Sequence, residues 1–159
     1  MGQRLDYFKL AGEACRTLVE FTQGAHKASV DHTLGDLITL RASQLNGCAF
    51  CVDMHVKEAK IHGERELRLY HVSVWRESPL FSDRERAALE WTELLTRLDP
   101  TGIPDDAYGR VAQQFTDKEL VDITMLVIAI NSWNRLGVGF RSEPGSADKA
   151  YGLDKANLR

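Results

Sequence analysis

The sequence has no long apolar run and no surplus of positive charge. Its longest uninterrupted apolar run, Met125 to Ile130, has six residues, whereas a helix that crosses a bilayer needs about 20. Lys and Arg number 20 against 23 Asp and Glu, which gives a net charge of −3. Broad electrostatic capture of DNA or RNA requires clustered Lys and Arg. We therefore expect neither a membrane partner nor a nucleic-acid partner.

Cysteine is also scarce, and no apolar secretion signal opens the chain. The first residues, Met1 to Asp6, lack the apolar core that such a signal needs, which predicts a cytoplasmic protein. The three cysteines, Cys15, Cys48 and Cys51, are too few and too unevenly spaced for the disulfide framework of a secreted domain. In a reducing compartment, the close pair Cys48 and Cys51 indicates redox chemistry or metal binding.

Apolar residues recur with a helical period, and no segment alternates as a half-buried strand does. The expected helices cover residues 6 to about 25, 33 to about 45, 48 to 62, 64 to about 75, 82 to about 98, 105 to about 115, and 116 to about 135. Capping-box patterns open two of them, at Ser82 to Glu85 and at Thr116 to Glu119. The predicted fold class is all-α, a single domain of about six to seven helices at residues 1–141, followed by a polar C-terminal tail at 142–159.

The last predicted helix is apolar on nearly all sides between Leu120 and Ile130. A helix without a polar face is either central in the core or covered by another subunit. This composition therefore favours a homo-oligomer.

One short segment combines three reactive side chains. In the run Asn46-Gly47-Cys48-Ala49-Phe50-Cys51-Val52-Asp53-Met54-His55, Gly47 ends one helix and the cysteines open the next. Cys48, Cys51 and His55 then share one helical edge. Unsatisfied N–H groups and the helix dipole favour a thiolate at this position, His55 can accept the thiol proton, and a second thiol can trap the oxidised sulfur. The spacing predicts a thiol-dependent redox site.

The run from Arg41 to Lys60 resembles the core of the alkylhydroperoxidase AhpD family, within the carboxymuconolactone decarboxylase-like superfamily. The segments Arg4 to Tyr7 and Ala129 to Arg135 are also similar to small members, so the resemblance covers about residues 4 to 141. It implies an all-helical fold, trimers or hexamers, and reduction of a hydroperoxide by a thiol pair. A thiol or lipoyl-type reductant would restore the pair, and no bound cofactor or metal is expected.

The resemblance also assigns roles to individual residues. Cys51 would be the peroxidatic sulfur, Cys48 the more exposed resolving sulfur that meets the reductant, and His55 the proton relay. The family usually has a glutamate twelve residues before the first motif cysteine, where this chain has the shorter Asp36. A water would then bridge Asp36 to His55. Phe50 stands where well-characterised members can carry a histidine.

Several alternatives stay open at this point. The pair Cys48 and Cys51 with His55 would also suit a zinc-bound helical assembly module, although closed zinc sites use four ligands. A carboxymuconolactone decarboxylase-like lyase would need no thiol pair. Asp36 would equally suit a role as an acid that stabilises the start of its helix. Cys15 is expected to be a small buried apolar residue, and Trp133 a pocket, interface or core residue.

Overall fold

The computed structural model describes residues 2–27 and 29–158. Three residues, Met1, Ala28 and Arg159, lie outside these ranges. Met1 is the first residue of the predicted domain at 1–141, and Arg159 is the last residue of the predicted tail at 142–159. The described part is all-helical, as the apolar period predicts, and contains no strand. Its elements are α1 (Tyr7–Leu10), α2 (Gly12–His26), α3 (His32–Leu45), α4 (Ala49–Ile61), α5 (Glu66–His71), η1 (Val72–Val74), α6 (Asp83–Thr96), α7 (Asp105–Ala112), α8 (Asp117–Phe140), α9 (Asp148–Tyr151) and η2 (Leu153–Ala156).

Local capping sets several of these boundaries. The two predicted capping boxes are confirmed, with Ser82 and Glu85 at the start of α6 and Thr116 and Glu119 at the start of α8. Each box satisfies N–H groups that have no partner inside the helix. The local sequence therefore determines where α6 and α8 begin.

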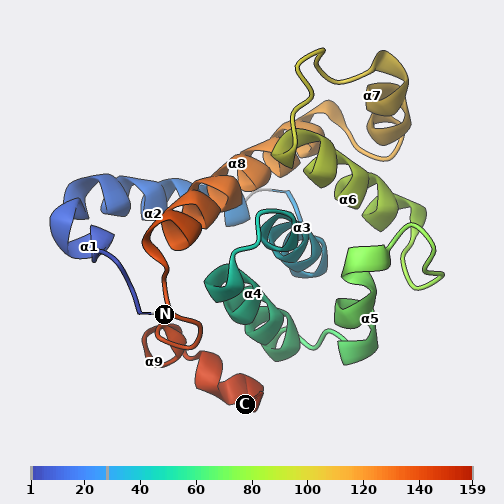
Figure 1. Ribbon diagram of the computed structural model, residues 1–159. Coiled ribbons are helices and arrows are strands. Elements are labelled where there is room, and N and C mark those ends of the chain that lie inside the picture. The colour runs from blue at the N-terminus through green and yellow to red at the C-terminus, as the bar shows by residue number, and fades with distance from the viewer. Residues whose placement is uncertain (1, 28, 159) are drawn as a thin grey trace.

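Helix α3 lies in the middle of the fold and contacts α4, α6 and α8 (Figure 1). Its residues Leu37, Ile38 and Leu40 have no exposed surface. Because neighbours surround it on several sides, α3 is apolar well beyond a single stripe. Helix α4, whose start carries the two cysteines, packs against α3 and is positioned by it.

Three predicted helices differ from the observed ones. The helix expected from 6 to 25 breaks at Ala11, whose backbone (φ −130°, ψ 44°) leaves the helical region and separates α1 from α2. The helix expected to end near Trp75 ends as the 3₁₀ turn η1. The last helix runs past Arg135 to Phe140, where Arg141 takes a left-handed conformation (φ 55°) and ends it. Together with α9 in the C-terminal segment, these differences raise the described α-helices to nine.

The polar C-terminal segment folds back onto the domain in the part that is described. Leu153 is 2% exposed, and η2 packs against α4. The buried ammonium of Lys57 on α4 bridges Asp53 on the same helix, at 2.7 Å, and Asp148 on α9, at 2.8 Å. In Figure 1 this segment, coloured red, lies next to α4 and the N-terminus. It therefore reaches the same end of the fold as the start of the chain.

Helix α8 packs on α2, α3, α4 and α6, yet one of its faces stays open. Val121, Met125 and Ile128 are 56%, 43% and 48% exposed. We call these three residues the α8 stripe. The single chain thus buries only part of the apolar surface of α8. No described helix combines the length and apolar character that crossing a membrane requires.

Candidate active site

The two motif cysteines form a disulfide at the start of α4. Gly47 has φ +65°, a left-handed conformation that ends α3 and lets the chain turn at once into α4. Cys48 is the N-cap of α4, and its Sγ accepts a hydrogen bond from the N–H of Cys51 at 3.3 Å. The sequence prediction that the thiol pair occupies a helix start is confirmed.

A network of amides holds this turn against α8. Asn46 Nδ2 donates to Asn131 Oδ1 at 3.0 Å and to Asn134 Oδ1 at 2.9 Å, and Asn134 in turn donates to Ser43 Oγ. Asn134 is 1% exposed. Because buried amides are costly when unpaired, this network favours a single position of the turn and of the cysteines that follow it.

The backbone of α8 covers the sulfurs at Gly137. A Cβ at this position would lie 2.7 Å from Cys48 Sγ and 3.4 Å from Cys51 Sγ, so only glycine permits the observed approach. Cys48 is 1% exposed and Cys51 is 3% exposed. The expectation that Cys48 is the more exposed sulfur is therefore wrong for the single chain, because α8 lies directly on it.

Cys51 instead opens into a cavity of about 560 Å³. Met54, His55 and Glu58 follow Cys51 by three, four and seven residues along α4, and all four line this cavity. Residues at such spacing lie on one face of a helix. The sequence prediction that Cys51 and His55 share an edge agrees with this arrangement.

His55 is paired with a carboxylate that the sequence analysis missed. Its Nδ1 lies 2.6 Å from Glu58 Oε2, one turn further along α4. Partial burial would raise the pKa of Glu58, but the hydrogen bond and charge of His55 outweigh it and hold that pKa below its usual value. Glu58 is therefore ionised at neutral pH. The signal was present in the sequence, since Glu58 follows His55 by three residues and Cys51 by seven.

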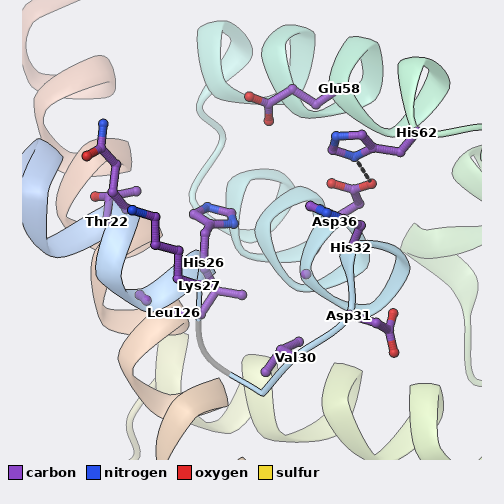
Figure 2. A pocket seen from close by; sticks show the side chains of 13 residues that line it. Thr22, His26, Lys27, Val30, Asp31, His32, Asp36, Glu58, His62 and Leu126 are labelled. Carbon is purple, nitrogen blue, oxygen red and sulfur yellow. Dashed lines mark hydrogen bonds and ion pairs between the residues drawn. The ribbon is translucent and has the colours of Figure 1, made fainter.

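Asp36 makes no hydrogen bond or ion pair with His55. Its Oδ2 lies 2.7 Å from Nδ1 of His62, which follows at the end of α4 (Figure 2). Burial raises the pKa of the Asp36 carboxyl, and His62 only partly offsets that shift. Asp36 thus belongs to a pair of its own, beside the His55–Glu58 pair.

The Asp36–His62 pair lines a second recess of about 380 Å³. Figure 2 shows Glu58, His26, Asp36 and His62 around this recess, on α2, α3 and α4. His26 and Glu58 line both hollows, so the two spaces adjoin. Burial lowers the pKa of His26 below its usual value, which keeps its ring neutral at pH 7.

Metal binding finds no support in this geometry. Among residues 2–27 and 29–158, no three His, Cys, Asp or Glu side chains are arranged to hold a metal ion. The sulfurs are bonded to each other, and His55 on α4 and His62 just after its end each pair with a carboxylate. The zinc alternative therefore has no set of ligands in the described part of the chain.

The other walls of the cavity are largely apolar and aromatic. Trp133 stacks on Phe8, with ring centroids 5.8 Å apart, and its indole N–H donates to Thr22 Oγ1 at 2.8 Å. Because that N–H is satisfied, the indole offers the cavity an apolar surface. The C-terminal segment closes part of the rim through Ser142, Ser146, Ala147, Ala150 and Tyr151.

Comparison with known proteins places this site in a family. The model of the carboxymuconolactone decarboxylase family matches residues 12–94, which include the thiol pair, His55 and Glu58. The chain belongs to the carboxymuconolactone decarboxylase family. The AhpD-like resemblance drawn from the motif is thereby confirmed.

Relatives in this family cover nearly the whole chain. The uncharacterized protein YdfG of Bacillus subtilis (strain 168) is 36% identical over 146 residues, 92% of this chain and 99% of its own length. The crystal structure of ATU0492 from Agrobacterium tumefaciens, a protein of unknown function suggested to be the antioxidant defence protein AhpD, is 44% identical with a TM-score of 0.87 and covers 90% of this chain and 98% of that one. A peroxidase-related protein of Ralstonia eutropha JMP134 with an AhpD core, at 17% identity and a TM-score of 0.77, covers 87% of this chain and 74% of its own, and shares the fold.

Proposed function

We propose that the protein is a thiol-dependent peroxidase that reduces hydroperoxides through Cys48 and Cys51. The observation that carries the proposal is the position of Cys51, disulfide-bonded to Cys48 and lining a cavity beside the His55–Glu58 pair. A lone structural disulfide would need neither a proton acceptor nor a substrate-sized space next to it.

The first half of the reaction oxidises the thiol pair. His55 takes the proton of the Cys51 thiol, and the thiolate attacks one oxygen of the hydroperoxide. The O–O bond breaks, Cys51 becomes a sulfenic acid, and the departing alkoxide takes the proton from His55 to leave as an alcohol. The Cys48 thiol then attacks the sulfenic sulfur, water leaves, and the disulfide forms. Glu58 stabilises the protonated state of His55 between these steps.

The second half restores the thiols at the expense of a dithiol or lipoyl-type reductant. Since Cys51 lines the cavity and Cys48 lies under Gly137, we place the attack of the reductant on Cys51. Cys48 then leaves as a thiolate that retains the hydrogen bond from the N–H of Cys51. A second thiol of the reductant resolves the mixed disulfide. This route reverses the role that the resemblance gave to Cys48.

Two variants and one stoichiometry test the function. Peroxide added in equal amount to the reduced chain should consume two thiols, and mass spectrometry should locate the loss of two hydrogens in the peptide with Cys48 and Cys51. Cys51→Ser should abolish peroxide-dependent oxidation of dihydrolipoamide. Cys15→Ser is the matched control, because Cys15 is a buried free thiol and should not be needed. Full turnover by Cys51→Ser would reject the proposal.

The lyase alternative predicts the opposite dependence. Carboxymuconolactone turnover that survives the loss of both Cys48 and Cys51 would favour it. The close packing of Gly137 on the sulfurs argues against it, because a lyase site has no need of a covered thiol pair.

We also propose that the α8 stripe is covered by a second copy of the chain, in a trimer or hexamer as the resemblance implies. Three large apolar side chains in line on one helix favour such burial. Light scattering after size exclusion should give an oligomeric mass that Ile128→Lys reduces. Leu98→Lys, at an exposed leucine outside the α8 stripe, is the control.

We also propose that the protein works in the cytoplasm, because a thiol pair that must be reduced again after each turnover suits a reducing compartment.

A further inference from the structure

The cavity beside Cys51 has the wrong charge for an anionic ligand. Among the described residues that line it, none is Lys or Arg, whereas Glu58 is an ionised carboxylate. His55 is balanced by Glu58, and the lowered pKa of His26 keeps that ring uncharged at neutral pH. A buried carboxylate without a partner is costly. An anionic ligand would meet no positive side chain in this space other than His55, whose charge Glu58 already offsets.

The shape and lining of the cavity favour an aromatic ligand. Its volume of about 560 Å³ lies in the usual range for organic small molecules, roughly 300–1,000 Å³. Phe50, Met54, Leu126, Ile130 and Trp133 supply much of its wall, and the Phe8–Trp133 stack sets a flat aromatic surface at one side. Aromatic rings stack well on such surfaces.

The reactive sulfur of this cavity lies beside the His55–Glu58 pair, along one stripe of α4. Cys51, His55 and Glu58 lie there, with Met54 between Cys51 and His55 in the sequence. A ligand with one polar end and an apolar ring would direct the polar end to the sulfur. Hydrogen peroxide would leave the apolar walls unused.

We propose that the preferred substrate of this site is an uncharged hydroperoxide with an aromatic ring, and that the cavity discriminates against carboxylate-bearing hydroperoxides. The inference rests on the proposed peroxidase function and adds the substrate class to it. The apolar wall binds the ring, and the absence of Lys and Arg side chains rejects the acid. The hydroperoxide group lies against Cys51.

A pair of substrates that differ only in charge tests the proposal in the wild-type protein. The substrates are 4-(2-hydroperoxypropan-2-yl)benzoic acid, ionised at pH 7, and its methyl ester, assayed with dihydrolipoamide as the reductant. We expect kcat/KM for the ester to exceed that for the acid by roughly 10- to 100-fold. The kcat/KM for cumene hydroperoxide should likewise exceed that for hydrogen peroxide. Equal values, or a preference for the acid, would overturn the proposal.

A charge placed in the cavity should reverse the discrimination. Met54→Lys puts an ammonium on the cavity wall, and we expect the acid-to-ester ratio of kcat/KM to rise by about tenfold or more. Leu67→Lys is the control, because Leu67 is 53% exposed on α5 and does not line the cavity. An unchanged ratio in a folded Met54→Lys protein counts against the proposal.

Binding of the product alcohols separates this inference from the function. Calorimetry should detect binding of methyl 4-(2-hydroxypropan-2-yl)benzoate to the oxidised protein and at least tenfold weaker binding of the free acid. If the ester binds selectively but no peroxide is turned over, the ligand class of the cavity stands and the peroxidase function falls. If peroxides are turned over but neither selective binding nor selective turnover is found, the function stands and this inference falls.

Discussion

At the scale of single residues, Gly137 sets how closely α8 can approach the thiol pair. The space that its missing side chain leaves is occupied by the sulfurs of Cys48 and Cys51. Gly139 lies two residues further along the same helix, and a Cβ there would meet no atom within 4 Å. The two glycines therefore have different structural roles despite their similar positions in the sequence.

Gly137→Ala should therefore destabilise the protein, by about 1–3 kcal/mol, because α8 must move off the sulfurs. Gly139→Ala should instead raise the free energy of unfolding by roughly 0.5–1 kcal/mol, as alanine does in an open helical position. Urea denaturation of both oxidised variants measures the contrast. Equal effects of the two substitutions would contradict a specific contact at Gly137.

Glu58 is the second residue with a specific role, because its carboxylate pairs with His55. Glu58→Gln removes the negative charge beside His55 while keeping a side chain of similar size. We expect kcat/KM for peroxide to fall by roughly 10- to 100-fold, the loss that is typical when a metal-bound histidine loses the carboxylate that orients its ring. Because the pKa of Glu58 lies below its usual value, the loss of activity that protonation of this carboxylate causes at acidic pH should disappear from the pH–rate profile.

Glu66→Gln provides the matched control for this change. Glu66 is exposed, pairs with Lys60 at 2.9 Å, and does not line the cavity. Its replacement should leave the profile in place. Asp36→Asn tests whether the Asp36–His62 pair takes part in proton transfer. A loss of kcat/KM for peroxide larger than that caused by Glu58→Gln would assign the proton relay to Asp36.

At the scale of elements, Lys57 attaches the C-terminal segment to α4. Its ammonium is buried between Asp53 and Asp148, and Asp53 also accepts a hydrogen bond from the N–H of Gly145. Burial lowers the pKa of Lys57, but the hydrogen bonds to Asp148 and Asp53 outweigh it and raise that pKa above its usual value. Lys57 therefore stays charged, and the two carboxylates do not face each other uncompensated.

Lys57→Met should release this segment, because two carboxylates then lie together without a cation. Amide hydrogen exchange in residues 142–158 should accelerate, while exchange in α3 stays slow. Lys60→Met, which removes a more exposed lysine of the same helix, should not produce this pattern. Uniform acceleration along the whole chain would mean general destabilisation instead of release of the segment.

At the scale of the whole molecule, we expect ion pairs at the start of α8 to contribute to stability in acid. Hydrogen bonds from Arg84 and Thr116 lower the pKa of Glu119 to about 2, and those from Lys118 and Ser29 lower the pKa of Asp122 to about 2. A carboxylate with a lowered pKa in the folded state stabilises that state above its unfolded pKa and loses the effect as the pH falls through the folded value.

We therefore expect the free energy of unfolding to change little with these groups above about pH 4.5. Between that value and pH 2 it should decline as the unfolded chain takes up protons first. Denaturant titrations at several pH values measure the slope, and Glu119→Gln with Asp122→Asn should flatten it. A slope unaffected by the double variant would assign acid sensitivity to other carboxylates.

The sequence by itself determined the helical class, the two capping boxes and the start of α4 at the thiol pair. These features follow from spacing within one element, such as Ser82 with Glu85, or Cys51 with His55. Glu58 was equally within reach of such spacing. The spacing within one helix predicts which of its side chains share a face, and this prediction does not depend on how the helices pack.

Only the tertiary structure decided the rest of the site. In the folded chain Asp36 pairs with His62 instead of His55, and Gly137 packs against Cys48. Trp133 and the C-terminal segment line the cavity. These contacts join residues far apart in the chain, and their distances depend on how α3, α4 and α8 pack. Periodicity within a helix fixes which face a residue occupies, but it carries no information about which neighbour meets that face.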